Sequence, residues 1–151
     1  MIEVVPFKAE HFKLEDLRDP SGPAAFGESF KKLCEVYESG GLAWTIMDND
    51  KVVASGGVIF YWPGVGEGWM LVTKRARAYP LALIKVMKKG IDAASREMKL
   101  NRIHATVKCD DRQALRLAKI LGFQVEGRLR RYGPDGKDYF MCGRVSRWLK
   151  P

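Results

Sequence analysis

Apolar and polar residues alternate along Ile103–Lys108, in the last third of the chain. The two sets are Ile103, Ala105 and Val107 on one side and His104, Thr106 and Lys108 on the other. An alternation of period two is typical of a strand that buries one face. The segment therefore predicts a half-buried strand, with His104 on the face turned away from the core.

A helix is predicted directly after this strand. Asp110 and Asp111 can accept hydrogen bonds from the first amides of a helix, which is the role of an N-cap. Apolar residues then recur at spacings of three and four, namely Ala114, Leu117, Ala118 and Leu121. Gly122 can adopt the left-handed backbone that ends a helix, so the helix is predicted to stop there.

The same periodicities predict the remaining elements. Further strands are expected at Ile2–Phe7, Leu42–Met47, Val52–Trp62, Glu67–Thr73, Gln124–Arg131 and Lys137–Val145. Helices are expected at Glu28–Tyr37 and Tyr79–Met98, because both carry an apolar stripe at helical spacing. Asp19–Gly27, rich in proline and glycine, predicts a loop. This order indicates an α/β chain, with a mixed sheet and helices on its faces.

Length and composition favour one globular domain over residues 1–151. A chain of 151 residues that is 46% hydrophobic can bury one sizeable core. No apolar run reaches the ~20 residues that span a bilayer, and the N-terminus lacks a signal core, so a cytoplasmic protein is expected. Cys34, Cys109 and Cys142 have no zinc-type spacing and are expected to be reduced thiols, with no metal site.

The chain is strongly basic, with a net charge of +8. This charge favours an anionic partner: the phosphates of coenzyme A, a nucleic acid or an acidic protein. The basic residues gather in two places, Lys74–Arg77 and Arg128–Arg131. No aromatic stacking pattern of a nucleic-acid module accompanies them, so nucleic acid is the least favoured of the three, and a solvated face explains the second cluster.

The element order, and above all the C-terminal third, resembles the GNAT superfamily of acyl-CoA-dependent N-acetyltransferases. The likeness extends over about Val4 to Val145, and it is carried by the alternating strand, the acidic cap, the helix stripe and Leu121–Phe123. Glu126–Arg130, followed by Asp135–Asp138, is similar to the branch that acetylates the N-termini of ribosomal proteins. The resemblance implies a mostly antiparallel sheet with helices on both faces, acetyl-CoA as cosubstrate and a primary amine as acceptor.

In that family, the strand equivalent to Glu67–Thr73 splays away from its neighbour. The resemblance therefore places the pantetheine arm of acetyl-CoA, and the amide that polarises its thioester, near Leu71, Val72 and Thr73. Glu67 is then the candidate general base, acting through a water molecule, and a solvated strand-end carboxylate is the alternative. His104 and His11 match no catalytic motif and are expected to be non-catalytic.

The next turn binds pyrophosphate in the family, where glycines let backbone amides approach the phosphates. Here the equivalent segment is Arg75–Pro80. Arg75 fits the family pattern, whereas Ala78 adds a methyl group and Pro80 lacks an amide hydrogen. Lys74, Arg75 and Arg77 can compensate with positive charge, so Arg75, Arg77 and Ala78 are expected at the coenzyme.

The helix after the cap departs from the family as well. Asp111 stands where asparagine is usual, and it too is expected near the coenzyme. Ala118 stands where many relatives carry a tyrosine that protonates the departing thiolate. The resemblance therefore leaves the proton donor for the leaving group unassigned.

Two functions stay open on the sequence alone. The first is an N-acetyltransferase acting on a protein or a small molecule. The second is a GNAT-like structural or binding module without activity, with a protein partner. The altered turn together with Trp69 resembles internal virion proteins of short-tailed phages, which would imply a phage or prophage origin and a place in the virion. A homodimer is also open, since Phe60–Trp62 predicts an exposed apolar patch.

Overall fold

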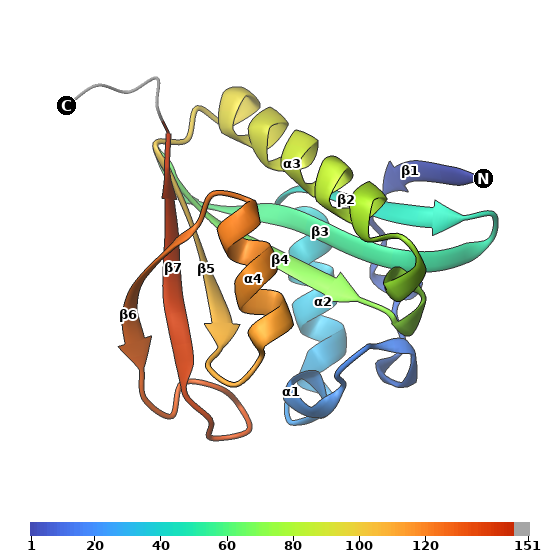
Figure 1. Cartoon of the computed structure of the whole chain (residues 1–151), viewed down its shortest axis with the longest axis horizontal. Helices are drawn as coiled ribbons and strands as arrows, with labels where there is room; N and C mark the ends of the chain where they lie inside the picture. Colours follow the sequence, from blue (N-terminus) through green and yellow to red (C-terminus); the bar gives the residue numbers. More distant parts are fainter. Residues whose placement is uncertain (147–151) are drawn as a thin grey trace.

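The protein folds around one seven-stranded sheet, seen in Figure 1, and the computed structural model describes residues 1–146. The strand order is β1-β2-β3-β4-β5-β7-β6, and within it only the β4–β5 pair is parallel. The strands are β1 Ile2–Pro6, β2 Gly41–Asp48, β3 Lys51–Trp62, β4 Val65–Val72, β5 Arg102–Lys108, β6 Gln124–Leu129 and β7 Tyr139–Val145.

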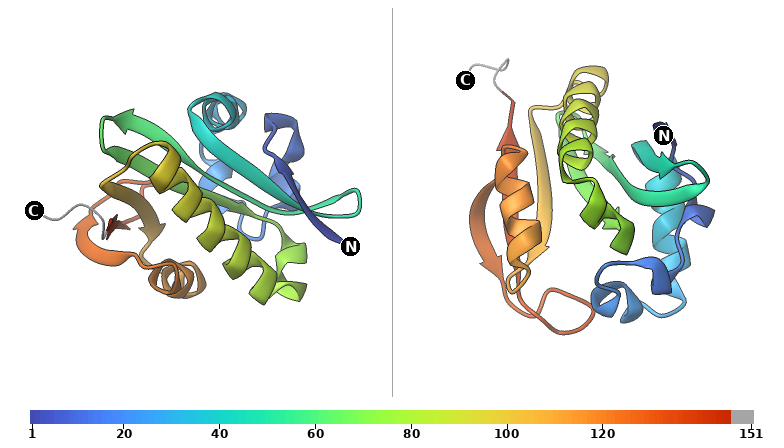
Figure 2. Two further views of the ribbon diagram at one scale, coloured as in Figure 1. Left: turned by 90° about the horizontal axis from the view of Figure 1, so that it is seen from above. Right: turned by 45° about the vertical axis from the view of Figure 1, so that its right-hand side comes forward.

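Helices cover both faces of this sheet, which confirms the predicted α/β fold class. Helices α3 (Pro80–Glu97) and α4 (Arg112–Ile120) lie on one face, and α2 (Ser29–Ser39) lies on the other (Figures 1 and 2). Each face has its own core. Leu83, Met87 and Ala118 belong to the larger core, whereas Phe30 and Cys34 of α2 belong to the smaller one. No helix in residues 1–146 combines the length and apolar character needed to cross a bilayer.

Alternation along β4 and β5 assigns their side chains to the two faces, because successive side chains of a strand point to opposite sides. Met70 packs with the core beneath α3 and α4, while Trp69 and Leu71 belong to the core beneath α2. On β5, Ile103 is buried in the α3–α4 core, so its neighbour His104 points to the α2 face. The predicted orientation of the β5 side chains is confirmed.

The predicted boundaries differ from the structure at several elements: β4, for example, begins at Val65 and not at Glu67. The segment expected to be a loop, Asp19–Gly27, contains a one-turn helix, α1 (Ser21–Ala24). The last hairpin is shorter than predicted at both strands, because Arg131 has a positive φ of 52° and donates its amide to Asp138 Oδ1 at 3.0 Å. The Arg131 amide therefore serves the hairpin loop and not the β6–β7 ladder.

Candidate active site

Strands β4 and β5 separate soon after they begin to pair. Their parallel register extends only from Val65–Arg102 to Glu67–His104, and the two strands then diverge (Figure 1). A pocket of about 750 Å³ lies at this gap. Its lining includes Met70 from one side of the sheet and Thr106 from the other, so the pocket reaches both faces at the point where the sheet is open.

The backbone of β4 offers hydrogen-bonding groups to the gap at alternate residues. Thr73 donates its amide to the Val53 carbonyl of β3 at 3.1 Å. Backbone groups along a strand point alternately to its two edges, so Leu71 also faces β3, whereas Met70 and Val72 face the gap. Of the three predicted residues Leu71, Val72 and Thr73, all line the pocket, but only Val72 turns its backbone toward the opening.

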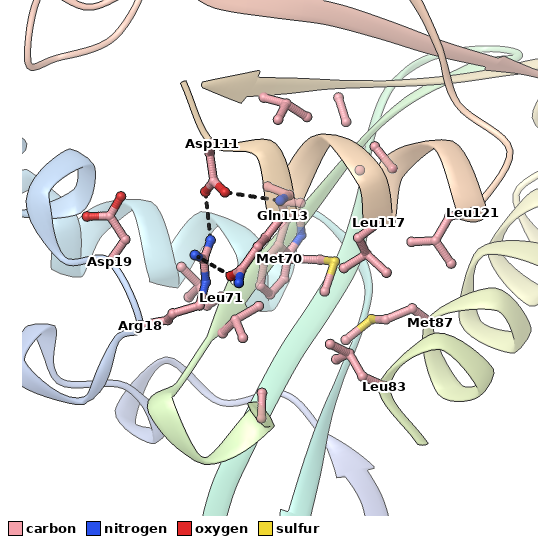
Figure 3. Close-up of a pocket in the computed structure, with 18 of the residues that line it drawn as sticks. Arg18, Asp19, Met70, Leu71, Leu83, Met87, Asp111, Gln113, Leu117 and Leu121 are labelled. Atoms are coloured by element: carbon pink, nitrogen blue, oxygen red, sulfur yellow. Dashed lines mark hydrogen bonds and ion pairs between the residues drawn. The ribbon is translucent and has the colours of Figure 1, made fainter. Parts of the chain in front are cut away.

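Helices α3 and α4 build an apolar wall along the pocket, as Figure 3 shows. The wall consists of Leu83 and Met87 from α3 and Ala114, Leu117, Ala118 and Leu121 from α4. Ala118 is only 8% exposed and has no hydroxyl group to offer a ligand. The wall suits an aliphatic chain, since binding of such a chain would remove the apolar surface of both from water.

A short segment, Leu17–Asp19, crosses the gap and forms a strap. The Arg18 amide donates to the Val72 carbonyl at 2.8 Å. Its guanidinium group reaches Asp111 Oδ2 at 2.6 Å and Gln113 Oε1 at 3.1 Å (Figure 3). The strap thus joins the end of β4 to the start of α4.

Asp111 connects the strap to the helix. Its other oxygen, Oδ1, accepts a hydrogen bond from the Ala114 amide at 3.0 Å, which confirms Asp111 as the N-cap of α4. Arg18 could not be predicted from the pattern of residues, because Arg18 and Asp111 are separated by 93 positions along the chain. Lys108 supports the same region, with its Nζ 3.2 Å from Asp135 Oδ2 and 3.8 Å from Asp19 Oδ2.

The turn that follows β4 is a 3₁₀ helix, Lys74–Ala78. The Ala76 amide donates to the Thr73 carbonyl at 3.2 Å, and the Tyr79 amide donates to the Ala76 carbonyl at 2.9 Å. These two amides are therefore used within the turn, and Pro80 at the first position of α3 has none to offer.

The basic residues of this turn point in different directions. Lys74 and Arg77 line the pocket, while the predicted coenzyme residues Arg75 and Ala78 lie outside its lining and are exposed. Tyr79 donates its phenolic hydrogen to Asp48, which fixes the start of α3 against the end of β2. This bond, together with the N-terminal ammonium group, lowers the pKa of Asp48.

Glu67 points to the α2 face of the sheet, like Trp69 two residues later. Tyr61, Tyr37 and His104 surround it at distances over which its charge acts. Burial raises the pKa of Tyr61 to about 12, and the charge of Glu67 and a hydrogen bond to it add to this effect. Burial likewise raises the pKa of Tyr37, with the Glu67 charge as the next cause. The site thus gathers one carboxylate, two phenols and one imidazole beside the gap.

Trp69 anchors this face. Its ring stacks on Tyr37 of α2, with centroids 4.0 Å apart and planes 5° from parallel, and Phe7 packs against its edge. The stack fixes α2 over β4 and positions the Tyr37 side chain near Glu67. Glu67 is half-buried and lies outside the pocket lining, on the α2 face of the sheet.

Comparison with solved structures defines the fold class. The ribosomal-protein-S5-alanine acetyltransferase of Vibrio fischeri superposes with a TM-score of 0.74 at 16% identity, covering 99% of this chain and 96% of the other. An IAA acetyltransferase from Bacillus cereus gives 0.72 at 11% identity, with 97% and 100% covered. A GNAT-family acetyltransferase from Streptococcus pneumoniae gives 0.68 at 13%, with 96% and 99% covered.

The fold is therefore that of the GNAT acetyltransferases, and at these identities the likeness establishes the fold alone. No protein-family model matches the sequence, and no curated protein matches it either. What the site does chemically has to be argued from its own residues.

Proposed function

We propose that this protein is an acetyl-CoA-dependent N-acetyltransferase that transfers an acetyl group to a primary amine of a protein or a small molecule. The observation that carries this proposal is the early end of the β4–β5 ladder at Glu67–His104, with a pocket of about 750 Å³ behind it. The gap exposes strand-edge amides and an apolar wall, and the Glu67 carboxylate lies at the last paired position before the gap. A thioester that donates acetyl to an amine can use all three groups.

In this proposal the pantetheine arm extends along the gap-facing edge of β4, against the wall formed by α3 and α4. Its amides would pair with the backbone of Met70 and with the Val72 amide, because the Val72 carbonyl already accepts from the Arg18 amide. The thioester carbonyl would accept a hydrogen bond from one of the same strand-edge amides, which stabilises the oxyanion as negative charge develops.

The diphosphate would lie at the start of α3. The first turn of a helix has amides without intrahelical partners, and Tyr79 provides no side-chain cap there. Lys74, Arg77 and Arg116 line the pocket and add positive charge. Because the 3₁₀ turn uses two of its own amides, we expect side-chain cations to supply more of the phosphate affinity than a glycine-rich turn would need.

The acceptor amine would approach from the α2 face, where Glu67 lies. The amine nitrogen attacks the thioester carbonyl carbon, the carbon–sulfur bond breaks and coenzyme A leaves as a thiolate. A basic group on this face takes a proton from the nitrogen, and Glu67, directly or through water, is the candidate that the sequence predicts. Ala118 has no proton to give, so the thiolate must obtain one from another group or from water.

Calorimetric titration of the purified protein with acetyl-CoA, followed by a thiol-release assay with amine acceptors, tests this proposal. Saturable one-to-one binding in the micromolar range and amine-dependent thiol release are the expected results. A folded protein that gives no heat at millimolar acetyl-CoA would contradict the proposal. Desulfo-coenzyme A is a suitable control ligand, since it retains the phosphates and the arm but cannot donate acetyl.

A second candidate is a binding module that keeps the scaffold without catalysis. The 3₁₀ turn favours it, because the Ala76 and Tyr79 amides are already bonded within the chain. The phage or prophage origin suggested by sequence resemblance belongs to this candidate. Absence of acetyl-CoA binding, combined with specific capture of a partner protein, would support it over the first.

A further inference from the structure

His104 is paired with Glu67 in the last register position of β4 and β5 before the strands separate. His104 follows Ile103, whose side chain is buried beneath α3 and α4, and Glu67 lies two residues before Trp69, whose side chain is buried beneath α2. Both Glu67 and His104 therefore point to the α2 face. His104 is half-buried, and the edge of its ring contacts Tyr61, with centroids 5.0 Å apart. The imidazole is therefore held at the apex of the gap, beside the proposed base.

Polar and charged side chains of β3, β4, β5 and β6 lie near His104. Glu67 faces it from β4, and Tyr61 covers it from β3. Arg102, two residues earlier on β5, binds the Glu126 carboxylate of β6 through two contacts of 2.9 and 2.5 Å. On β7 the register partner of His104 is Gly143, which contributes no side chain and lets Glu126 lie close.

These neighbours have opposite effects on the pKa of His104. Burial lowers the pKa of His104 from its ordinary value of 6.5, and Arg102 acts in the same direction. Glu67 and Glu126 act in the opposite direction, since a negative charge stabilises an imidazolium ion. Burial and Arg102 thus favour the neutral ring, which can accept a proton, and the adjacent Glu67 carboxylate stabilises the charged form.

We infer that His104 is a catalytic residue, the group that accepts the proton of the acceptor amine, with Glu67 as its electrostatic partner. The inference rests on the proposed acetyltransferase function and deepens it. Glu67 attracts the amine in its ammonium form, which first loses one proton to solvent. The neutral amine then faces a neutral imidazole and a thioester at the apex of the gap.

The step balances without a further reactant. The amine nitrogen forms a bond to the thioester carbonyl carbon, and a nitrogen-bound proton moves to a ring nitrogen of His104. The carbon–sulfur bond breaks, and sulfur keeps the electron pair as a thiolate. The imidazolium then returns the proton to the thiolate, directly or through water, giving an amide and a thiol.

This assignment accounts for Ala118. Where many GNAT enzymes use a tyrosine of the α4 helix to protonate the thiolate, this chain has a methyl group on the wall of the pocket. A histidine that first takes a proton and then returns it performs both steps with one side chain. The sequence pattern did not reveal this role, because alternation places His104 only on the outer face of an isolated strand.

The test compares His104→Gln, His104→Ala and Glu67→Gln with the wild type in acetyl transfer from pH 5.5 to 9. We expect kcat of His104→Gln to fall by about 100-fold or more, the usual contribution of a general base. Its KM for acetyl-CoA should stay unchanged. The acidic limb of the wild-type profile, below pH 6.5, should disappear in both histidine variants, and added imidazole should restore part of the His104→Ala rate.

Two further variants, Glu67→Gln and His11→Gln, show whether the change in the pH profile is specific to His104. In Glu67→Gln the acidic limb should move to lower pH, because the imidazolium loses its partner, and kcat should fall more than KM rises. His11→Gln is the matched control, since His11 lies in the 3₁₀ helix Ala9–His11, beside Thr45 of β2. It should leave the acidic limb where it is.

Two results would overturn the inference. The first leaves the acetyltransferase function intact, and the second removes it. If His104→Gln keeps the wild-type kcat and the same acidic limb, Glu67 or water is the base, and the acetyltransferase function stands. If the wild type neither binds acetyl-CoA nor releases thiol, the proposed function fails, and the role of His104 fails with it. Circular dichroism and melting curves identify a variant that has lost its fold, and His104→Asn then replaces it.

Discussion

Arg18 reaches across the opening between β4 and β5 and holds Asp111 at 2.6 Å, while its own amide binds the Val72 carbonyl. One residue of the N-terminal region thereby ties together the two halves of the sheet at the point where they are not paired. Asp111 in turn caps α4, so the strap, the cap and the wall of the pocket depend on one another.

Removing this contact should destabilise the protein moderately. Arg18→Ala is expected to lower the free energy of unfolding by ~1 kcal/mol, since the pair is partly exposed and screened by solvent. Asp111→Ala should cost ~1–2 kcal/mol, because it also removes the N-cap. Urea denaturation of the two single variants and the double variant measures these losses and the interaction energy between the two residues. Fully additive effects would show that the two residues do not interact in solution.

Pro80 limits the amides available at the start of α3. Pro80→Gly restores one N–H at the first helical position, and a bond to a charged oxygen is worth ~1.5 kcal/mol or more. The double variant Ala78→Gly/Pro80→Gly should therefore bind acetyl-CoA about tenfold more tightly in calorimetric titration. Ala78→Gly alone is the control, and we expect little change from it, since Ala78 lies outside the pocket lining. Unchanged affinity of the double variant would refute a weakened phosphate site.

The basic residues at the pocket should make coenzyme binding sensitive to salt. Lys74→Gln/Arg77→Gln is expected to weaken acetyl-CoA binding by about tenfold at low salt and to flatten its salt dependence. Lys88→Gln/Lys89→Gln removes the same charge from a part of α3 outside the pocket lining and should have a much smaller effect. Equal losses in both double variants would indicate a general effect of net charge and not a phosphate site.

His11 should make stability depend on pH. Its Nδ1 accepts a hydrogen bond from the Lys8 amide at 3.2 Å and lies 2.8 Å from the buried Thr45 hydroxyl. Burial lowers the pKa of His11 below 6.5, so the unfolded chain binds a proton more readily than the folded one. The contribution of neutral His11 to the free energy of unfolding is therefore complete above pH 6.5. It is lost as the pH falls through the pKa that His11 has in the folded protein.

Melting temperatures of the wild type and His11→Gln between pH 4.5 and 8 measure this contribution. The difference between the two proteins should shrink as the medium becomes acidic. A difference that stays constant over this range would contradict the assignment of the pH dependence to His11. His104, whose pKa is also lowered, remains in both proteins and so cancels in the comparison.

The local elements were set by the sequence itself. Alternation along Ile103–Lys108 predicts β5, and the structure places a strand at Arg102–Lys108. Asp111 is the N-cap as predicted, and Gly122 has the expected positive φ of 96°. These features depend on contacts between residues only a few positions apart, which the order of side chains determines directly. The resemblance carried by the same residues also implied the correct fold.

The site was decided by tertiary structure. Periodicity cannot say where two parallel strands stop pairing, because that depends on the twist of the whole sheet and on the helices packed against it. It therefore could not place Glu67 beside His104, bring Arg18 to Asp111, or show that Leu71 and Thr73 turn their backbones to β3. Each of these relationships joins residues far apart in the chain, and only packing of the complete sheet brings them together.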